Sequence, residues 1–331
     1  AQVVAEREKP RVTFVHVRGN FLDRGQKVEP GTPEVLHPLK RGEKTSRLEL
    51  ANWLVDQANP LTARVTVNHL WRNLFGEGLV KTVADFGTQG DQPSHPELLD
   101  WLAVTFMEQG WSRKQLIRTI VLSSTYRQSS EQREELVTRD PKNRMLARQN
   151  RFRLSGENAR DQYLAASGLL DRTIGGESVG PESKRRGLYL KFKRSFPEYM
   201  LVAFDAPTST APCPARERSN TPLQALTLLN DELFVRSARE LGRRALYSSD
   251  QLPARLGYLF RSAVARNPDE EEQRILTEAF HGMLEHYKMN PEAAWQLSGL
   301  KLDQQDAPVV LAAHIALART ILNLDEVITR E

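Results

Sequence analysis

The stretch NPLTARVTVNHLWRNLFG, residues 59–76, decides the fold. Asn59 and Pro60 supply an N-cap and a first-turn proline, and Gly76 supplies the helix end, so the stretch predicts an amphipathic helix. At about 100° per residue, one broad arc of this helix is apolar, yet Arg64 and Asn68 lie inside that arc. The apolar members of the arc are Leu61, Val65, Val67, Leu70, Trp71, Leu74 and Phe75.

Arg64 and Asn68 each need a partner, because an unpaired guanidinium or amide is costly to bury. One interpretation is structural, with Arg64 in an ion pair to Asp85 or Asp100. The other is functional, with Arg64 and Asn68 on a ridge that faces a ligand. The helix pattern alone is compatible with both.

Length and charge bound the class of protein. A chain of 331 residues, 40% hydrophobic and 27% charged, has a globular composition and is long enough for one large or two ordinary domains. No apolar run approaches the roughly 18 residues of a membrane-spanning helix. The net charge of +4 is too small to favour nucleic acid as a partner. Cys213 is the only cysteine, so no intrachain disulfide can form and no cysteine pair exists for zinc, an iron–sulfur cluster or thioether-linked haem. No other metal-site or cofactor motif is complete, so we expect no metal and no cofactor in this chain.

Further helix signals follow along the chain. Ser46 with Glu49 and Ser94 with Glu97 have the spacing of capping boxes. Helices are also predicted from Ser112, at 141–148, 155–167, 221–247, 253–266 and 268–288, and from 308 to the end. An alternating run at 12–17 predicts a short strand. The glycine- and proline-rich segment at 175–214, with a second strand at 188–192, indicates a long ordered loop.

The predicted fold class is therefore mainly α, a multi-helix bundle-like domain with a minor β element and a long ordered loop region. We expect an extended N-terminal segment at 1–45 and a first helical subdomain at 46–130. A second helical subdomain is expected at 131–331, with the loop at about 175–214.

His95 and Asp85 are the candidate acid–base pair. Helical spacing places His95 at the rim of the apolar side of the helix that starts near Ser94, where it is either a hydrogen-bonded structural histidine or a general base. Asp85 begins the tripeptide Asp85-Phe86-Gly87, which matches a kinase magnesium motif but lacks the other kinase motifs, so it indicates a turn. Closeness of Asp85 to His95 would favour catalysis.

Basic residues gather at three further places. Arg216, Arg218 and Gln224 lie at a predicted helix start beside Ser219 and Asn220, and an anion would be favoured at that positive end. Helix initiation alone explains the Ser, Thr and Pro of this segment. Two stretches, 148–153 and 184–194, mix arginine and lysine with aromatic rings, which suits either polyanion binding or a solvated strand face.

Five segments carry a resemblance to a known family. They are NPLTARVTVNHLWRNLFGEGLVKTVADFG, HPELLDWLAVTFMEQGW, IVLSSTYRQSS, FDAP and RSNTPLQALTLLND. In this order they resemble the C-terminal domain of planctomycete cytochrome-c-domain proteins. That domain is called PSD-one and is a domain of unknown function (1553). The resemblance runs from about Gly19 to the terminal LNLDEV and implies context, not chemistry.

The resemblance implies a location and partners. Such domains usually end large exported proteins, so an extracytoplasmic location, periplasmic or at the cell surface, is expected. The implied partners are a cytochrome-c-like domain, which would carry haem, and a companion helical domain of the same protein or complex. The family usually has arginine where this chain has His69. The matching signature positions are Asn68, Trp71, Asp85, Gly90, His95, Tyr126, Arg127, Arg218, Ser219, Asn220 and Gln224.

Three functions follow as hypotheses. The first is an accessory or docking module, which predicts a large exposed apolar patch, for example near Trp53 or Trp295. The second is a hydrolase or lyase acting on an extracellular polymer, with His95 and Asp85 as catalytic residues and Arg127 or Arg218 holding an anionic group. The third is binding of a polyanion such as an acidic polysaccharide through residues 184–194.

Overall fold

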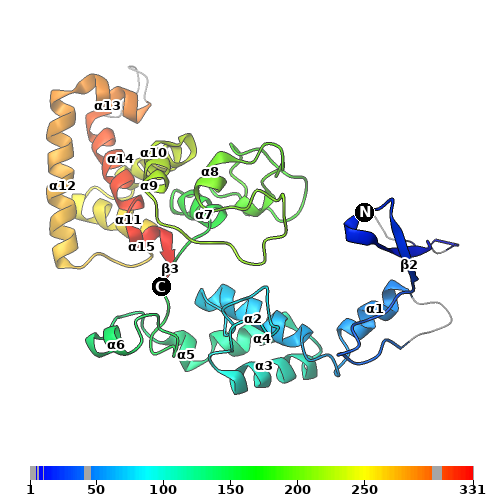
Figure 1. Cartoon of the computed structure of the whole chain (residues 1–331). Helices are drawn as coiled ribbons and strands as arrows, with labels where there is room; N and C mark the ends of the chain where they lie inside the picture. The colour runs from blue at the N-terminus through cyan, green and yellow to red at the C-terminus, as the bar shows by residue number, and fades with distance from the viewer. Residues whose placement is uncertain (1–4, 6, 10, 41–45, 300–307, 331) are drawn as a thin grey trace. The chain divides into compact units, whose positions relative to one another are not determined.

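The computed structural model describes residues 5, 7–9, 11–40, 46–299 and 308–330 (Figure 1). The chain forms two compact units, residues 1–128 with 132–148 and residues 129–131 with 149–331. Both are built mainly of helices, and the strands of the described residues form two small antiparallel sheets, β1–β2 and β3–β4. The predicted fold class, mainly α with a minor β element, is confirmed. Among the described residues we find no helix with the length and apolar character needed to cross a membrane.

The first unit begins with a hairpin and continues with helices. Its core lies between α2, α3 and α4 and includes Val67, Trp71, Phe75, Leu102 and Phe106. The elements are β1 (Thr13–His16), η1 (Val17–Gly19), β2 (Arg24–Val28), α1 (Arg47–Leu54), α2 (Thr62–Phe75), α3 (Pro96–Glu108), α4 (Arg113–Val121), α5 (Ser124–Arg127) and α6 (Glu134–Arg139).

Local capping signals explain where the first helices start. The Ser46 hydroxyl accepts from the Leu48 N–H, and Glu49 Oε2 accepts from the Ser46 N–H at 2.7 Å, so the predicted capping box of α1 is confirmed. Asn59 Oδ1 accepts from the N–H groups of Leu61 and Thr62 ahead of α2. At the other end Gly76, with φ of 85°, terminates α2 as expected.

The predicted capping box of Ser94 with Glu97 is wrong. The N-cap of α3 is His95, and Pro96 occupies the first helical position. The Ser94 N–H instead donates to the Leu79 carbonyl at 2.9 Å. This tertiary hydrogen bond holds Ser94 outside the helix, and the proline then sets the start.

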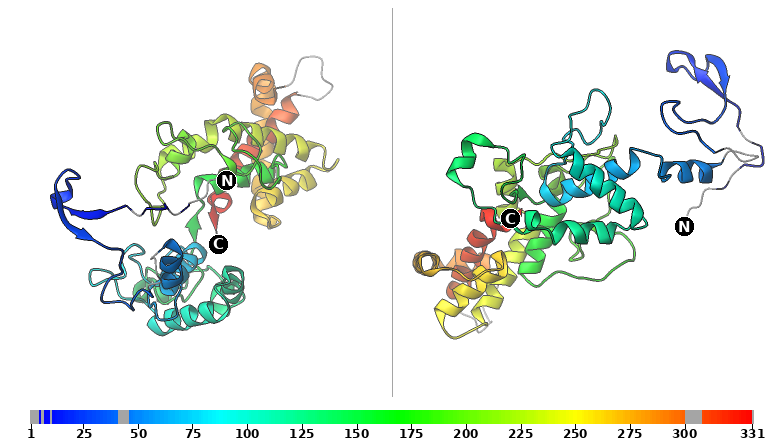
Figure 2. Two further views of the ribbon diagram at one scale, coloured as in Figure 1. Left: turned by 90° about the vertical axis from the view of Figure 1, so that its right-hand side faces the viewer. Right: turned by 90° about the horizontal axis from the view of Figure 1, so that it is seen from below.

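The second unit is larger and contains the remaining helices. In Figure 1 the long helix α12 lies beside α14, and Figure 2 shows the same helices from two further sides; α10 and α13 also contact α14. The elements are β3 (Phe152–Arg153), α7 (Gly156–Ala166), η2 (Gly187–Tyr189), α8 (Tyr199–Ala203), α9 (Pro222–Asn230), α10 (Glu232–Leu246), α11 (Leu252–Val264), α12 (Glu270–Met289), α13 (Pro291–Ser298), α14 (Pro308–Leu322), α15 (Asp325–Ile328) and β4 (Thr329–Arg330).

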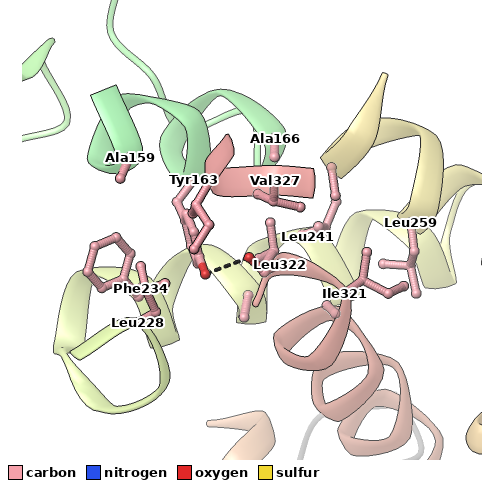
Figure 3. Packing of buried hydrophobic residues seen from close by; sticks show 14 of the residues in the cluster. Ala159, Tyr163, Ala166, Leu228, Phe234, Leu241, Leu259, Ile321, Leu322 and Val327 are labelled. Atoms are coloured by element: carbon pink, nitrogen blue, oxygen red, sulfur yellow. Dashed lines mark hydrogen bonds between the residues drawn. The ribbon is translucent and has the colours of Figure 1, made fainter. Parts of the chain in front are cut away.

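The core of the second unit joins segments that are far apart in sequence. Figure 3 shows Tyr163 of α7 among Phe234, Leu241 and Ile321, with its hydroxyl donating to the Leu322 carbonyl at 2.6 Å. A Cβ at Gly242 would lie 2.8 Å from the Ile315 backbone, so glycine lets α10 and α14 cross closely.

Four further predicted elements differ from the structure, and one of them is the helix expected from 308 to the end, which is divided into α14, α15 and the strand β4. Residues 141–148 form turns rather than a helix, with Asn143 and Leu146 at positive φ, and the neighbouring charged linker contains α6. Residues 188–192 form no strand, because the chain starts a 3-10 turn at Gly187, which lies so near α7 that a Cβ there would be 2.9 Å from the Glu157 side chain. The helix predicted at 221–247 is divided into α9 and α10 by Asp231, which caps α10.

Candidate functional site

Asn68 is fully buried, and both polar atoms of its side chain form hydrogen bonds with backbone groups. Its Nδ2 donates to the Val80 carbonyl, and its Oδ1 accepts from the Val80 N–H, both at 2.9 Å. Gly78 lies against this amide so closely that a Cβ there would be 2.8 Å from both of its polar atoms. The Asn68 amide therefore pins the segment after α2 to that helix.

Arg64 is in the ion pair with Asp100 that the structural interpretation predicted. Its Nε lies 2.6 Å from Asp100 Oδ1, and its Nη1 donates to the Pro60 carbonyl. The side chain is 35% exposed, so it lies at the edge of the apolar arc. Its donors stabilise the start of α2 against α3.

Asp85 and His95 have separate hydrogen-bond partners. Asp85 Oδ1 accepts from the Gly87 N–H at 2.7 Å, which makes the predicted turn. His95 Nδ1 lies 3.0 Å from the Ser94 hydroxyl. Within the described residues no hydrogen bond joins Asp85 to His95, so the catalytic role of this pair stays a prediction.

The aromatic signature residues of the first unit belong to its core. Trp71 stacks on Phe75 with ring centroids 4.2 Å apart, and Phe75 meets Tyr126 edge-on at 5.5 Å. Arg127, the last residue of α5, is exposed.

Signature residues of the second unit form a polar cluster around Asp205. Ser219 donates to the Asp205 carboxylate from both its N–H, at 2.7 Å, and its hydroxyl. Gln224 is buried, and its Nε2 donates to the Ser219 hydroxyl at 3.1 Å, while its Oε1 has no partner in the described structure. Asn220 is exposed beside this cluster.

The basic residues of the predicted anion and polyanion sites contact rings, a carboxylate and carbonyls. Arg218 lies over the Phe152 ring at 4.2 Å, and Arg216 pairs with Glu157. In the basic stretch 184–194, the Arg185 guanidinium covers the Tyr189 ring at 4.0 Å and donates to the carbonyls of Glu177 and Thr173. Part of the predicted polyanion surface thus holds the long loop together.

A pocket of about 210 Å³ lies within the second unit, and six of its ten lining residues are charged. Arg160 comes from α7, Glu198 is the residue before α8, Asp231 separates α9 from α10, and Arg236 lies on α10. The rest of the lining is Pro181, Glu182, Leu190, Met200, Glu232 and Leu233.

The two guanidinium groups of the pocket are held by the loop before α8. Arg160 is fully buried and donates to the carbonyls of Arg185, Pro181 and Ser183. Arg236 donates from Nη2 to the Glu182 carbonyl at 3.0 Å, and its Nε is buried without a partner. Three loop carbonyls therefore hold Arg160, and one holds Arg236.

The carboxylates of Glu198 and Asp231 have different environments. Burial raises the pKa of Glu198, and the Asp231 carboxylate adds to that shift, whereas the nearby backbone N–H groups of Met200 and Tyr199 and the Arg160 guanidinium lower the pKa. Asp231 Oδ1 accepts from the Leu233 N–H at 3.0 Å and caps α10. With Glu182 and Glu232, the lining contains four acidic and two basic residues, so its net charge is acidic.

Helices α8 and α9 connect this pocket to the Asp205 cluster. Glu198 precedes α8 and Asp231 follows α9, and both residues line the pocket. Asp205 follows α8 and bonds Ser219 and Gln224 at the start of α9. The two helices therefore run antiparallel, with one polar cluster at each end.

A family model for a protein of unknown function, PSD1 (DUF1553), matches residues 46–280. The chain belongs to the PSD1 family. Comparison with curated proteins and with solved structures found no match. The matched part of this PSD1 chain runs from α1 to α12 and contains the pocket and the Asp205 cluster, whereas the β1–β2 hairpin lies before it.

Sequence reasoning missed five residues of the second unit, Arg160, Glu198, Asp205, Asp231 and Arg236. Asp205 and Asp231 lie within the quoted segments FDAP and RSNTPLQALTLLND, but the predicted helix ran through Asp231. An aspartate followed by a glutamate is itself a helix-start signal and would have revealed the break. Among the described residues no group of three His, Cys, Asp or Glu side chains has the geometry to hold a metal ion.

Proposed function

We propose that this PSD1 chain is an accessory module that docks onto a companion domain of the same protein or complex. The observation that carries the proposal is the pair of exposed apolar faces on α8 and α9, together with exposed apolar side chains in the loops before them. Exposed apolar side chains on one helix face can form the centre of a docking surface. They are Ile174, Leu188, Phe192, Phe196, Tyr199, Val202, Leu223 and Leu226.

The exposed groups of α8 and α9 are separate from those that hold the helices. On α8, Tyr199 and Val202 are exposed while Met200 and Leu201 are buried. On α9, Leu223 and Leu226 are exposed while the opposite side is buried. Apolar pairs at this three-residue spacing present one helix face to a partner.

Trp53 and Trp295 contribute less to an exposed surface. Trp53 is buried, stacks on His37 and donates from its indole N–H to the His37 carbonyl at 2.7 Å. Trp295 is 39% exposed on α13. We therefore assign the docking surface to α8 and α9.

The resemblance to planctomycete cytochrome-c-domain proteins supports the choice of partner. We propose an extracytoplasmic location, periplasmic or at the cell surface, and a haem-bearing cytochrome-c-like domain or companion helical domain as the docked neighbour. Haem would belong to that neighbour. Localisation of the native protein by cell fractionation tests the first part, since recovery in the cytoplasmic fraction would contradict it.

Titration calorimetry between this chain and its purified cytochrome-c-like neighbour tests the docking. Leu223→Asp with Leu226→Asp should weaken binding at least about tenfold, because two charges enter an apolar contact. Ile275→Asp is the matched control, since Ile275 is 50% exposed on α12 and lies away from α8 and α9 in sequence. Absence of binding, or an equal loss in the control, contradicts the proposal.

A second candidate function is hydrolysis or eliminative cleavage of an extracellular, anionic polymer. The observation favouring it is the carboxyl of Glu198, whose pKa burial raises, beside Asp231, because acid–base catalysis uses carboxyl groups with different environments. Release of reducing ends from polygalacturonate measures this activity. Glu198→Gln should remove the activity, and His95→Gln should leave it unchanged. The reverse result would favour Asp85 and His95 as the acid–base pair.

A further inference from the structure

We infer that the pocket formed by Arg160, Glu198, Asp231 and Arg236 binds a lysine or arginine side chain of the docked partner. This inference rests on the proposed docking function. It names the chemical group of the partner that would enter the second unit of this chain. The pocket adjoins the docking surface directly, because Glu198 lies between the exposed Phe196 and Tyr199 in the chain.

The charge of the pocket selects a cation over an anion. The Arg160 donors are occupied by three loop carbonyls, and its Nη1 also lies 3.5 Å from Asp161. Arg236 has one nitrogen bonded to a carbonyl and another sealed from solvent. The carboxylates of Glu198 and Asp231 remain as hydrogen-bond acceptors, and acceptors require a ligand that donates.

The walls of the pocket suit the apolar part of a basic side chain. Leu190, Met200 and Leu233 line it together with Pro181. Lysine and arginine carry methylene stems that pack on apolar surface while the charged head reaches polar groups. At about 30 Å³ for each water, the volume of about 210 Å³ holds about as many waters as arginine has side-chain heavy atoms.

Binding of a cation would also explain why the pocket contains Glu198, although burying its charge destabilises the unbound protein. Glu198 is partly buried near a second carboxylate, and its raised pKa means that ionisation is less favourable than in water. An incoming ammonium or guanidinium group would neutralise that repulsion. Binding energy from the ligand thus offsets a destabilisation that is present without it.

The test uses model compounds, so it needs no partner protein. N-acetyl-lysine methylamide and N-acetyl-arginine methylamide are titrated into the full chain and followed by NMR, with N-acetyl-norleucine methylamide as the neutral control of similar shape. We expect at least one cationic compound to bind at least about tenfold more tightly than the neutral one. Equal affinities would overturn the inference.

Two pocket variants and one matched control locate the binding. Asp231→Asn and Glu198→Gln should each weaken binding of the cation about tenfold, whereas Glu292→Gln, on the exposed side of α13, should leave it unchanged. Thermal unfolding of each variant shows that it is folded. Wild-type affinity in both pocket variants would overturn the inference.

The outcomes separate this inference from the docking proposal. Leu223→Asp with Leu226→Asp should abolish docking and leave binding of the small cation intact. If the neighbour docks while no cation binds, the pocket assignment fails and docking stands. If the cation binds and the neighbour does not, docking fails, and so does the assignment of the cation to that neighbour.

Discussion

Helix α2 of the first unit and the α8–α9 pair of the second unit use polar residues in opposite ways. The buried Asn68 of α2 has both amide atoms bonded to Val80, and Arg64 is paired with Asp100. Around α8 and α9, Glu198 is partly buried beside Asp231, Gln224 has an unpartnered oxygen, and apolar groups are exposed.

The difference teaches which polar residues serve the fold. In α2 the sequence places polar groups inside an apolar arc, and the backbone satisfies them. Around α8 and α9 the fold leaves acceptors and apolar surface available. Residues that weaken stability in this way are expected where a protein binds something. Four predictions test that division, in order of decreasing effect.

Removing the amide of α2 should have the largest effect on stability. Asn68→Ala leaves the buried N–H and carbonyl of Val80 without partners, and should lower the free energy of unfolding by about 3 kcal/mol. Urea unfolding of the full chain measures it. Asn73→Ala, exposed on the same helix, is the control and should cost less than about 0.5 kcal/mol. Similar losses in both variants would remove the structural role of Asn68.

Acid should weaken the α12–α14 packing of the second unit. His314 is buried, its Nδ1 lies 2.8 Å from the Val310 carbonyl, and burial lowers its pKa. Between the two pKa values His314 is protonated in the unfolded chain and neutral in the folded chain. The free energy of unfolding should therefore fall as pH drops from about 6.5 toward the lower pKa of the folded state. Thermal unfolding against pH measures this, with His314→Gln expected to flatten the curve. An unchanged slope in the variant would assign the acid response elsewhere.

Removing the Glu198 charge should stabilise the protein slightly at neutral pH. Its raised pKa means that ionisation is less favourable when folded, so wild-type stability should decrease as pH rises from about 4.5 through the folded pKa. Glu198→Gln should lack this decrease and show a higher midpoint at pH 7 by thermal unfolding. The groups facing Glu198 are Arg160, Asp231 and Arg236. A lower midpoint of thermal unfolding in the variant would show that Glu198, like Asn68, stabilises the fold.

Changing the exposed face of α9 should have the smallest effect. Leu226 is 55% exposed, so Leu226→Gln should alter the free energy of unfolding by less than about 0.5 kcal/mol. Leu228→Gln on the buried side of α9 should destabilise strongly, because Leu228 belongs to the core. Equal losses would show that Leu226 supports the fold and is not a docking residue.

Local signals in the sequence predicted most helices. The Ser46–Glu49 box, the Gly76 stop and the Ser155 cap depend on residues within a few positions, and each is present in the structure. The start of α3 was missed because the Ser94 N–H bonds to Leu79, a contact between segments. Spacing rules carry no information about such tertiary bonds.

The candidate site shows the same limit more strongly. The helical wheel placed Asn68 correctly inside the apolar side of α2, but its partner Val80 follows only from the folded chain. Arg160, Glu198 and Asp231 come from three separate segments, and the antiparallel packing of α8 on α9 brings the last two together. No period or motif in the sequence encodes that meeting.

The close crossing at Gly242 bears on how this family should be handled at the bench. Ile315, which faces that glycine, and Leu322, which receives the Tyr163 hydrogen bond, both lie beyond residue 280, where the family match ends. An expression clone trimmed to residues 46–280 would lose α14 and uncover the inner sides of α7 and α10. Soluble preparations should therefore be designed to extend through Arg330.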